Sequence, residues 1–200
     1  MTEENNNMSL EIAELAKKAR DGNRMSFQEL VGMFQEDMYR LAYYRTFSQM
    51  DAEDITQEVF VQAYRKLKSL NDTGKFRAWL YSIAVNRCND FLRKRKFLSL
   101  LQLRSTEENV YMKENQGMNS SYDDSITKKR FWEQVRTLLG NFSAMEREVF
   151  TLRFMDHQNI KEISAILDKS ESTVKTHLYR ALNKARKDSV FFQDYRELLS

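Results

Sequence analysis

The sequence contains no proline, five glycines and a single cysteine among its 200 residues. The lone cysteine, Cys88, excludes an internal disulfide and argues against a small secreted scaffold held together by such bonds. Few residues are present that interrupt a helix, whereas Leu, Glu, Lys, Arg, Gln and Met are abundant. The composition therefore favours an all-helical protein over a β-sandwich, which would need more turn residues.

Long apolar runs are also missing. No window holds about 18 apolar residues, the length that a membrane-spanning helix needs. The N-terminal segment MTEENNNMSL has no apolar core of the kind that a signal peptide carries. We therefore expect no membrane insertion and a cytoplasmic location. The soft metal ligands Cys88, His157 and His177 are widely spaced, so we expect neither a metal site nor another cofactor.

Positive and negative charges nearly balance over the whole chain, which has a net charge of +3. Hydrophobic residues make up 42% of the sequence and charged residues 30%, which suits globular cores beneath a hydrated surface. Because the chain as a whole is not a polycation, any contact with nucleic acid must come from local basic patches.

Apolar residues recur at helical spacing in two parts of the chain. The first part is predicted to hold helices over residues 10–21, 27–47, 52–69 and 76–96. The second part is predicted to hold helices over 127–139, after Ser143, over 160–167 and over 171–187. The intervening residues 97–126 lose the periodicity and carry more acidic than basic residues after residue 103, which is typical of a linker.

The predicted fold class is all-α, with two small helical domains joined by a flexible linker. The predicted parts are an N-terminal helical extension at 1–24, a first domain at 25–96, the linker at 97–126, a second domain at 127–187 and a C-terminal tail at 188–200.

Residues with capping preferences mark several predicted helix ends. The pair Asp21-Gly22 is expected to end the first helix, because glycine accepts the left-handed backbone that follows many helices. Ser26 is expected to cap the second helix and Asp51 the third. Ser143, with Glu146 three residues later, has the pattern of a capping box.

Residues 161–186 have the pattern of a helix-turn-helix. The turn is Asp168-Lys169-Ser170, and either Ser170 or Ser172 would cap the second helix. The buried positions of the second helix are predicted to be Val174, Leu178, Ala181 and Ala185. Such a pair of crossed helices can present its second member to a groove of DNA.

The second helix of this pair directs a set of polar residues away from its buried positions. They are Lys175, Thr176, Tyr179, Arg180 and Asn183. Lysine and arginine can donate to guanine edges in the major groove, and Ser172 and Thr173 could meet phosphate at the helix start. Seven Lys/Arg against three Asp/Glu give residues 161–187 a local charge of +4. The same features also occur where basic residues simply hydrate a helical pair or bind protein.

The predicted helix over 76–96 carries aromatic, amide and basic residues on one side. At roughly 100° per residue, Asn86 lies near the direction of Trp79, and Arg93 extends the same side. Such a face suits a melted DNA strand, because amides read base edges, aromatic rings stack on bases and cations hold phosphates. Trp79 could equally belong to the core, where a tryptophan near a helix start is more often found.

Asp54, Gln57 and Glu58 share one face of the predicted helix over 52–69. Paired carboxylates can serve acid–base catalysis or Mg²⁺ binding, but no catalytic partner is visible in the sequence. A hydrated helix start, or a contact with a basic partner protein, explains the same residues. The sequence physics leaves these alternatives open.

Several stretches resemble the extracytoplasmic-function (ECF) sigma factors. DAEDITQEVF at 51–60 looks like that family's region 2.2, and FRAWLYSIAVN at 76–86, with the basic run at 93–96, looks like regions 2.3 and 2.4. EREVFTLRF at 146–154 and the stretch 162–186 look like region 4. Where the family commonly has glycine, this chain has His157 or Gln158, and Ser172.

The resemblance implies a non-enzymatic bacterial initiation factor that docks on RNA polymerase core and reads promoter DNA. Its two domains would be sigma-2 and sigma-4, and its linker would run through the RNA-exit path of the polymerase. The expected partners are the β′ and β subunits of the core, promoter DNA and an anti-sigma factor.

The resemblance also implies roles for individual positions. Contacts with the coiled coil of the β′ subunit would fall to Asp54, Gln57 and Glu58. Contacts with the minus-ten element would fall to Leu70, Asn71 and Asp72 in the loop at 69–75, and to Asn86. The face of the predicted helix over 76–96 would add Trp79 and Arg93 to these contacts. Contacts with the minus-thirty-five element would fall to Ser172, Thr173, Lys175, Thr176, Tyr179 and Arg180.

Two other functions fit part of the pattern. An ordinary two-domain helix-turn-helix regulator would bind duplex DNA without polymerase, usually as a dimer. A nucleic-acid enzyme would use the carboxylates at 51–58 with a metal ion. The aromatic and amide-bearing helix beside a separate helix-turn-helix favours the sigma factor over both, so we expect no catalytic residue.

Overall fold

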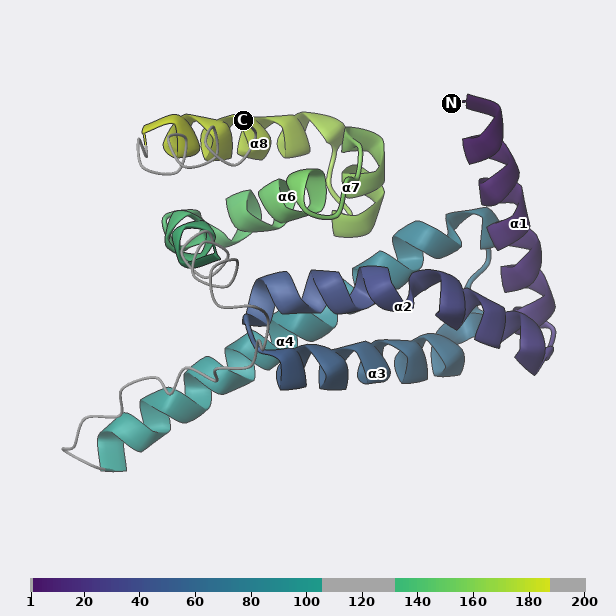
Figure 1. Ribbon diagram of the computed structural model, residues 1–200, viewed down its shortest axis with the longest axis horizontal. Coiled ribbons are helices and arrows are strands. Elements are labelled where there is room, and N and C mark those ends of the chain that lie inside the picture. Colours follow the sequence, from purple (N-terminus) through teal and green to yellow (C-terminus); the bar gives the residue numbers. More distant parts are fainter. Residues whose placement is uncertain (1, 106–131, 188–200) are drawn as a thin grey trace, which may run out of the picture. The chain divides into compact units, whose positions relative to one another are not determined.

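The computed structural model describes residues 2–105 and 132–187, and the chain divides into two compact units, Met1–Glu114 and Asn115–Ser200 (Figure 1). All regular structure in the described residues is helical. The predicted all-α fold with two helical units is therefore confirmed. The predicted linker residues 106–126 and the tail at 188–200 lie outside the described residues.

The first unit contains α1 (Thr2–Arg20), α2 (Arg24–Thr46), α3 (Gln49–Lys66) and α4 (Phe76–Ser105). Two single-turn 3₁₀ helices, η1 (Leu67–Ser69) and η2 (Thr73–Lys75), connect α3 to α4. Helices α2, α3 and α4 pack against one another in pairs, and α1 packs on α2 and on the connection (Figure 1).

Apolar residues at helical spacing build the core of this unit. The most deeply buried include Ala16 of α1, Leu30 and Leu41 of α2, Ala52 and Val59 of α3, and Phe76, Leu80 and Ala84 of α4. Each fully buried Leu or Phe contributes about 1.5–3 kcal/mol relative to an exposed one. Burial of these stripes therefore fixes how each helix is rotated about its own axis.

Two N-caps differ from the sequence prediction. Helix α2 is capped by Asn23 rather than Ser26, because the Asn23 side chain accepts a hydrogen bond from the Ser26 backbone N–H. Helix α3 is capped by Ser48 rather than Asp51, in the same geometry three residues earlier. Asparagine and serine are both favoured caps, and the residues after them are compatible with helix, so each helix begins one turn sooner.

The first helix ends as its sequence predicts. Gly22 has a φ of +107°, and the Asn23 backbone N–H donates to the Lys18 carbonyl at 3.0 Å. This is the bonding pattern of a Schellman cap, in which glycine occupies the left-handed position.

Helix α4 does not end at Lys96, where the sequence prediction placed its end and the start of the linker. It continues to Ser105 and extends beyond α2 and α3 (Figure 1). The stretch FLSLLQL at 97–103 contains neither glycine nor proline, and leucine and glutamine are good helix formers. The basic run is therefore an inner segment of a longer helix.

The second unit contains helical residues 132–140, α6 (Ala144–Phe154), α7 (Ile160–Leu167) and α8 (Glu171–Lys187). Helix α8 packs on both α6 and α7. The core residues include Val135, Leu138, Val149, Leu152, Ile163, Val174 and Ala181. The predicted core of α8 is confirmed at Val174, Ala181 and Ala185, whereas Leu178 is only half-buried.

Two features are absent from the described residues. Over residues 2–105 and 132–187, no helix combines the length and the apolarity that crossing a bilayer requires. Within the same ranges, no three His, Cys, Asp or Glu side chains lie together so that they could hold a metal ion.

The turn between α6 and α7 contains a strained residue, His157, whose φ is +54°. Two hydrogen bonds tie the next residue, Gln158, back to the end of α6. The Gln158 backbone N–H donates to the Leu152 carbonyl at 2.8 Å, and Arg153 donates to the Gln158 carbonyl at 3.1 Å. Left-handed backbone costs an L-residue roughly 1–2 kcal/mol, and glycine avoids that cost.

We therefore predict that His157→Gly raises the free energy of unfolding by about 0.5–1 kcal/mol, the relief of strain less the added freedom of the unfolded chain. Urea unfolding measures the change. Lys169→Gly, at an exposed turn residue without a positive φ, is the matched control and should lower stability. Equal destabilisation by the two changes would contradict the strain argument.

Candidate functional site

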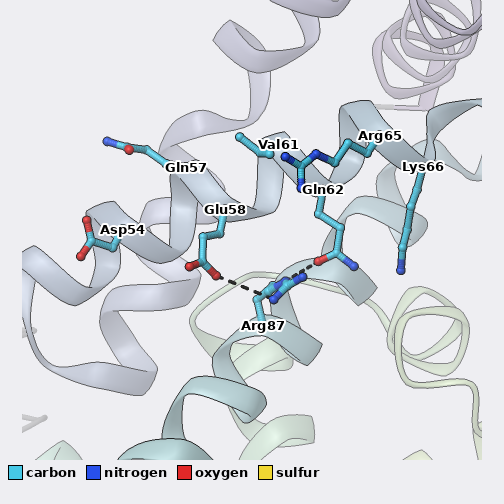
Figure 2. A pocket seen from close by; sticks show the side chains of 8 residues that line it. All are labelled: Asp54, Gln57, Glu58, Val61, Gln62, Arg65, Lys66 and Arg87. Atoms are coloured by element: carbon cyan, nitrogen blue, oxygen red, sulfur yellow. Dashed lines mark hydrogen bonds and ion pairs between the residues drawn. The ribbon is translucent and has the colours of Figure 1, made fainter.

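The acidic face of α3 lies on the surface of the first unit. Asp54, Gln57 and Glu58 are all exposed, and they line one open hollow (Figure 2). The other residues around this hollow are Val61, Gln62, Arg65, Lys66 and Arg87. The hollow is thus acidic towards the start of α3 and basic towards its end.

Arg87 of α4 bridges the middle of this hollow. Its guanidinium lies 3.8 Å from a Glu58 carboxylate oxygen and donates a hydrogen bond to the side-chain oxygen of Gln62. Asp54 and Gln57 point away from Arg87 (Figure 2). No pattern in the sequence singles out Arg87, because its partners lie 25 residues or more away in the chain.

The connection between η1 and η2 presents Asn71 and Asp72 to solvent, whereas the Leu70 side chain is 7% exposed and belongs to the core. Asp72 accepts a hydrogen bond from the Gly74 backbone N–H at 3.0 Å. Arg20, at the end of α1, donates to the backbone carbonyls of Leu70 and Asn71. Of the three loop residues predicted to contact DNA, Leu70 is therefore the one whose side chain is buried, while Asn71 and Asp72 remain exposed.

The outer face of α4 carries Trp79, Asn86 and Arg93. Trp79 is half-buried, with its ring 5.7 Å from that of Phe76 between centroids, so it lies at the edge of the core. Asn86 is exposed. Arg93 is exposed and pairs with Asp90 at 2.9 Å. The half-burial of Trp79 fits a place at the edge of the core, and its contact with DNA stays a prediction.

Helix α8 is capped by Ser170 rather than Ser172, because the Ser170 hydroxyl oxygen accepts from the Thr173 backbone N–H at 3.2 Å. Ser172 is left exposed at the helix start. The other exposed residues of the predicted DNA-facing set are Lys175, Thr176, Tyr179 and Arg180, while Thr173 is half-buried. Tyr179 is 66% exposed, which is high for an aromatic residue.

An ion pair between a buried carboxylate and a partly exposed lysine joins α6 to α8. Glu146 is 5% exposed, and its carboxylate accepts from Lys184 at 2.7 Å and from the Ser143 backbone N–H at 2.8 Å. The Lys184 hydrogen bond, and next the Ser143 one, hold the pKa of Glu146 below its usual 4.5, against the opposing effect of burial. The predicted Ser143–Glu146 capping box is confirmed.

Two family profiles match the chain: sigma-70 region 2 over residues 30–97 and sigma-70 region 4 over residues 132–184. The ECF RNA polymerase sigma factor SigW of Bacillus subtilis is 27% identical over 182 residues, which cover 90% of this chain and 97% of SigW.

Two solved structures share the fold. One is CnrH in complex with the cytosolic domain of CnrY, with a TM-score of 0.67, 24% identity, and coverage of 90% of this chain and 98% of that one. The other is the sigma factor RpoE of Bartonella quintana with the anti-sigma factor NepR, with a TM-score of 0.58, 22% identity, and coverage of 80% and 94%.

We predict that Glu146→Gln lowers the free energy of unfolding of the second unit by about 1–3 kcal/mol at neutral pH, because charge-assisted hydrogen bonds are lost. The folded-state pKa lies below the unfolded one, so this stabilisation is complete above pH 4.5 and disappears as the pH falls through the folded-state value. The difference in free energy of unfolding between the unchanged protein and Glu146→Gln should therefore shrink as the pH falls.

Urea unfolding followed by Trp132 fluorescence in a Trp79→Phe background reports on this unit, since the chain has two tryptophans. Glu171→Gln is the matched control, because it breaks an exposed pair with Lys175 at 3.8 Å and should cost less than about 0.5 kcal/mol. A Glu146→Gln effect that is equally small, or one that is independent of pH, would contradict the prediction.

Proposed function

The chain belongs to the sigma-70 family, in its extracytoplasmic-function group, and we propose that it is an alternative sigma factor. It would bind RNA polymerase core and direct initiation at promoters that it reads at the minus-thirty-five and minus-ten elements. The polymerase would perform the chemistry, and this chain would contribute no catalytic group. It would act where polymerase and promoter meet, in the bacterial cytoplasm.

The observation that carries this proposal is that both helical units match the family and both expose a polar face that the fold does not need. Asn86 on α4 and Arg180 on α8 are exposed beside well-buried core stripes. A residue that contributes little to packing is free to be selected for contact with a partner. One face would meet a melted strand and the other a paired duplex.

We propose that Asp54, Gln57 and Glu58 form the contact with the β′ subunit. Their exposure and the acidic end of the hollow suit a basic helical partner. Complementary charges of this kind speed association and fix the orientation of the two proteins more than they add raw affinity. Partner residues would then compete with Arg87 for Glu58.

We propose that the exposed residues of the first unit hold the melted minus-ten strand. Asn71 and Asp72 in the loop would hydrogen-bond base edges, and Asn86 would read a second position on the same strand. The half-exposed Trp79 ring could stack on a base, and Arg93 could hold a phosphate. Extrusion of a base costs a few kcal/mol, which these contacts would have to offset.

We propose that α8 enters the major groove of the minus-thirty-five element. Lys175, Thr176, Tyr179 and Arg180 would face base edges, and the exposed hydroxyl of Ser172 with Thr173 would meet a phosphate at the helix start. The ion pair of Glu146 with the partly exposed Lys184 would help to hold this helix against α6.

We further propose that an anti-sigma factor controls this protein, in response to stress. Support comes from the Bartonella quintana sigma factor RpoE, which shares the fold and was solved with the anti-sigma factor NepR. An anti-sigma factor that covered the α3 face would block polymerase core from the same residues.

We predict that run-off transcription will require both this protein and bacterial core polymerase. Asn86→Ala should reduce strand opening, measured by permanganate reactivity, while upstream protection persists. Arg180→Ala should weaken upstream recognition by about 1–3 kcal/mol if it makes a bidentate base contact. Lys187→Ala, an equal loss of charge at the exposed end of the same helix, is the matched control.

Specific duplex binding by the protein alone, with transcription unaffected by its addition to core, would instead indicate a helix-turn-helix regulator that acts without polymerase. If the Asn86→Ala and Arg180→Ala variants chose the same promoters as the unchanged protein, the proposed DNA contacts of these two residues would be wrong.

We predict that Asp54→Asn and Glu58→Gln each weaken binding to core polymerase by about three- to tenfold, because each removes one charge from the proposed contact. The loss should diminish at high salt, which screens exposed charges. Fluorescence anisotropy of the labelled protein measures the affinity. Glu36→Gln removes a carboxylate from α2 whose side chain is 84% exposed and should leave the affinity unchanged, so equal effects of all three changes would contradict the assignment.

A further inference from the structure

The end of α1 holds the loop between η1 and η2 by its backbone. One nitrogen of the Arg20 guanidinium donates to the Leu70 carbonyl at 3.0 Å and to the Asn71 carbonyl at 3.3 Å. Arg20 precedes Leu70 by 50 positions in the chain and Asn71 by 51. Because guanidinium is charged, such bonds are stronger than those between neutral groups.

Arg20 reaches the loop from a well-anchored support. Ile12, Leu15, Ala16 and Ala19 of the same helix are buried. The Schellman cap at Gly22 ends the helix directly after Arg20 and turns the chain into α2. The Arg20 side chain is 27% exposed, so most of it is held by neighbouring atoms.

The contact acts on the part of the loop whose side chains face solvent. Leu70 is buried beneath the loop, and Asp72 receives the Gly74 backbone N–H on its far side. Asn71 therefore lies between two fixed points, with its carbonyl bound and its side chain exposed. Ordering a residue before its ligand arrives removes an entropic cost from binding.

We propose that Arg20 is a positioning residue for base recognition: by holding the Leu70 and Asn71 carbonyls, it fixes the direction in which the Asn71 and Asp72 side chains meet DNA. This inference rests on the proposed contact of the loop with the minus-ten element. The region 2 profile begins at residue 30, so α1 would set base preference from outside the matched segment.

Run-off transcription with bacterial core polymerase on a barcoded pool of templates, randomised over both promoter elements, measures a base preference at every position. Arg20→Ala should lower the preference at one or two downstream positions by about three- to tenfold, the range expected when one base contact is weakened. Upstream preferences and affinity for core should be unchanged. Arg24→Ala removes an equal charge from an exposed site at the start of α2 and should change no preference.

A conservative variant separates positioning from mere folding. Arg20→Lys keeps a charged donor and should recover part of the lost preference. Circular dichroism checks that each variant is folded, and Arg20→Met, which keeps the apolar stem but no donor, replaces Arg20→Ala should that variant unfold.

Two results would overturn the proposal. One is an unchanged profile of base preferences in the variant without a donor. The other is an equal loss of transcription from all templates, whatever base they carry, which a purely structural role would give. Absence of core-dependent transcripts with the unchanged protein is a different result. It would remove the proposed function and this inference with it.

Discussion

Burial of one side of α4 is the constraint on which the first unit depends. Phe76, Leu80 and Ala84 are each no more than 1% exposed, and α4 packs on both α2 and α3. A helix turns by roughly 100° per residue, so this buried stripe decides where every other side chain on α4 points. Asn86 is exposed because its neighbours are buried, and no contact of its own is needed to place it.

Features that depend on local sequence were predicted well. The buried stripes, the capping box at Ser143 and Glu146, and the extent of α7 and α8 follow from spacing and propensity over a few residues. The N-caps at Asn23 and Ser48 were missed because a cap depends on where the chain turns, and adjacent residues were equally suitable. The sequence alone cannot decide which of several nearby residues becomes the N-cap, because tertiary contacts set where the chain turns.

Features that depend on distant contacts could not be predicted. Arg20 with the Leu70 carbonyl, and Arg87 with Glu58, each join segments far apart in the chain, and no periodicity connects them. The proposed binding residues present the opposite difficulty. They are exposed and carry little of the packing energy, so residue physics leaves several roles open for Asp54 and Glu58.

The second unit uses one buried carboxylate for two purposes. Glu146 completes the cap of α6 through Ser143 and also binds Lys184 on α8. A charge buried without partners costs several kcal/mol, and these two hydrogen bonds offset that cost for Glu146. The relative angle of α6 and α8 is therefore coupled to the start of α6, and the exposed face of α8 gains a fixed direction from that coupling.

In the ion pairs between α3 and α4, neither carboxylate is as buried as that of Glu146. Arg87 with Glu58 at 3.8 Å and Arg95 with Asp51 at 3.6 Å are partly exposed and long. Exposed pairs of this kind contribute about 0–1 kcal/mol, so they add little to the stability that the apolar core already supplies. A partner that offers a better-placed cation to Glu58 could exchange with Arg87 at small cost. Weak internal pairing thus leaves the acidic face hydrated and does not oppose the docking that we propose for it.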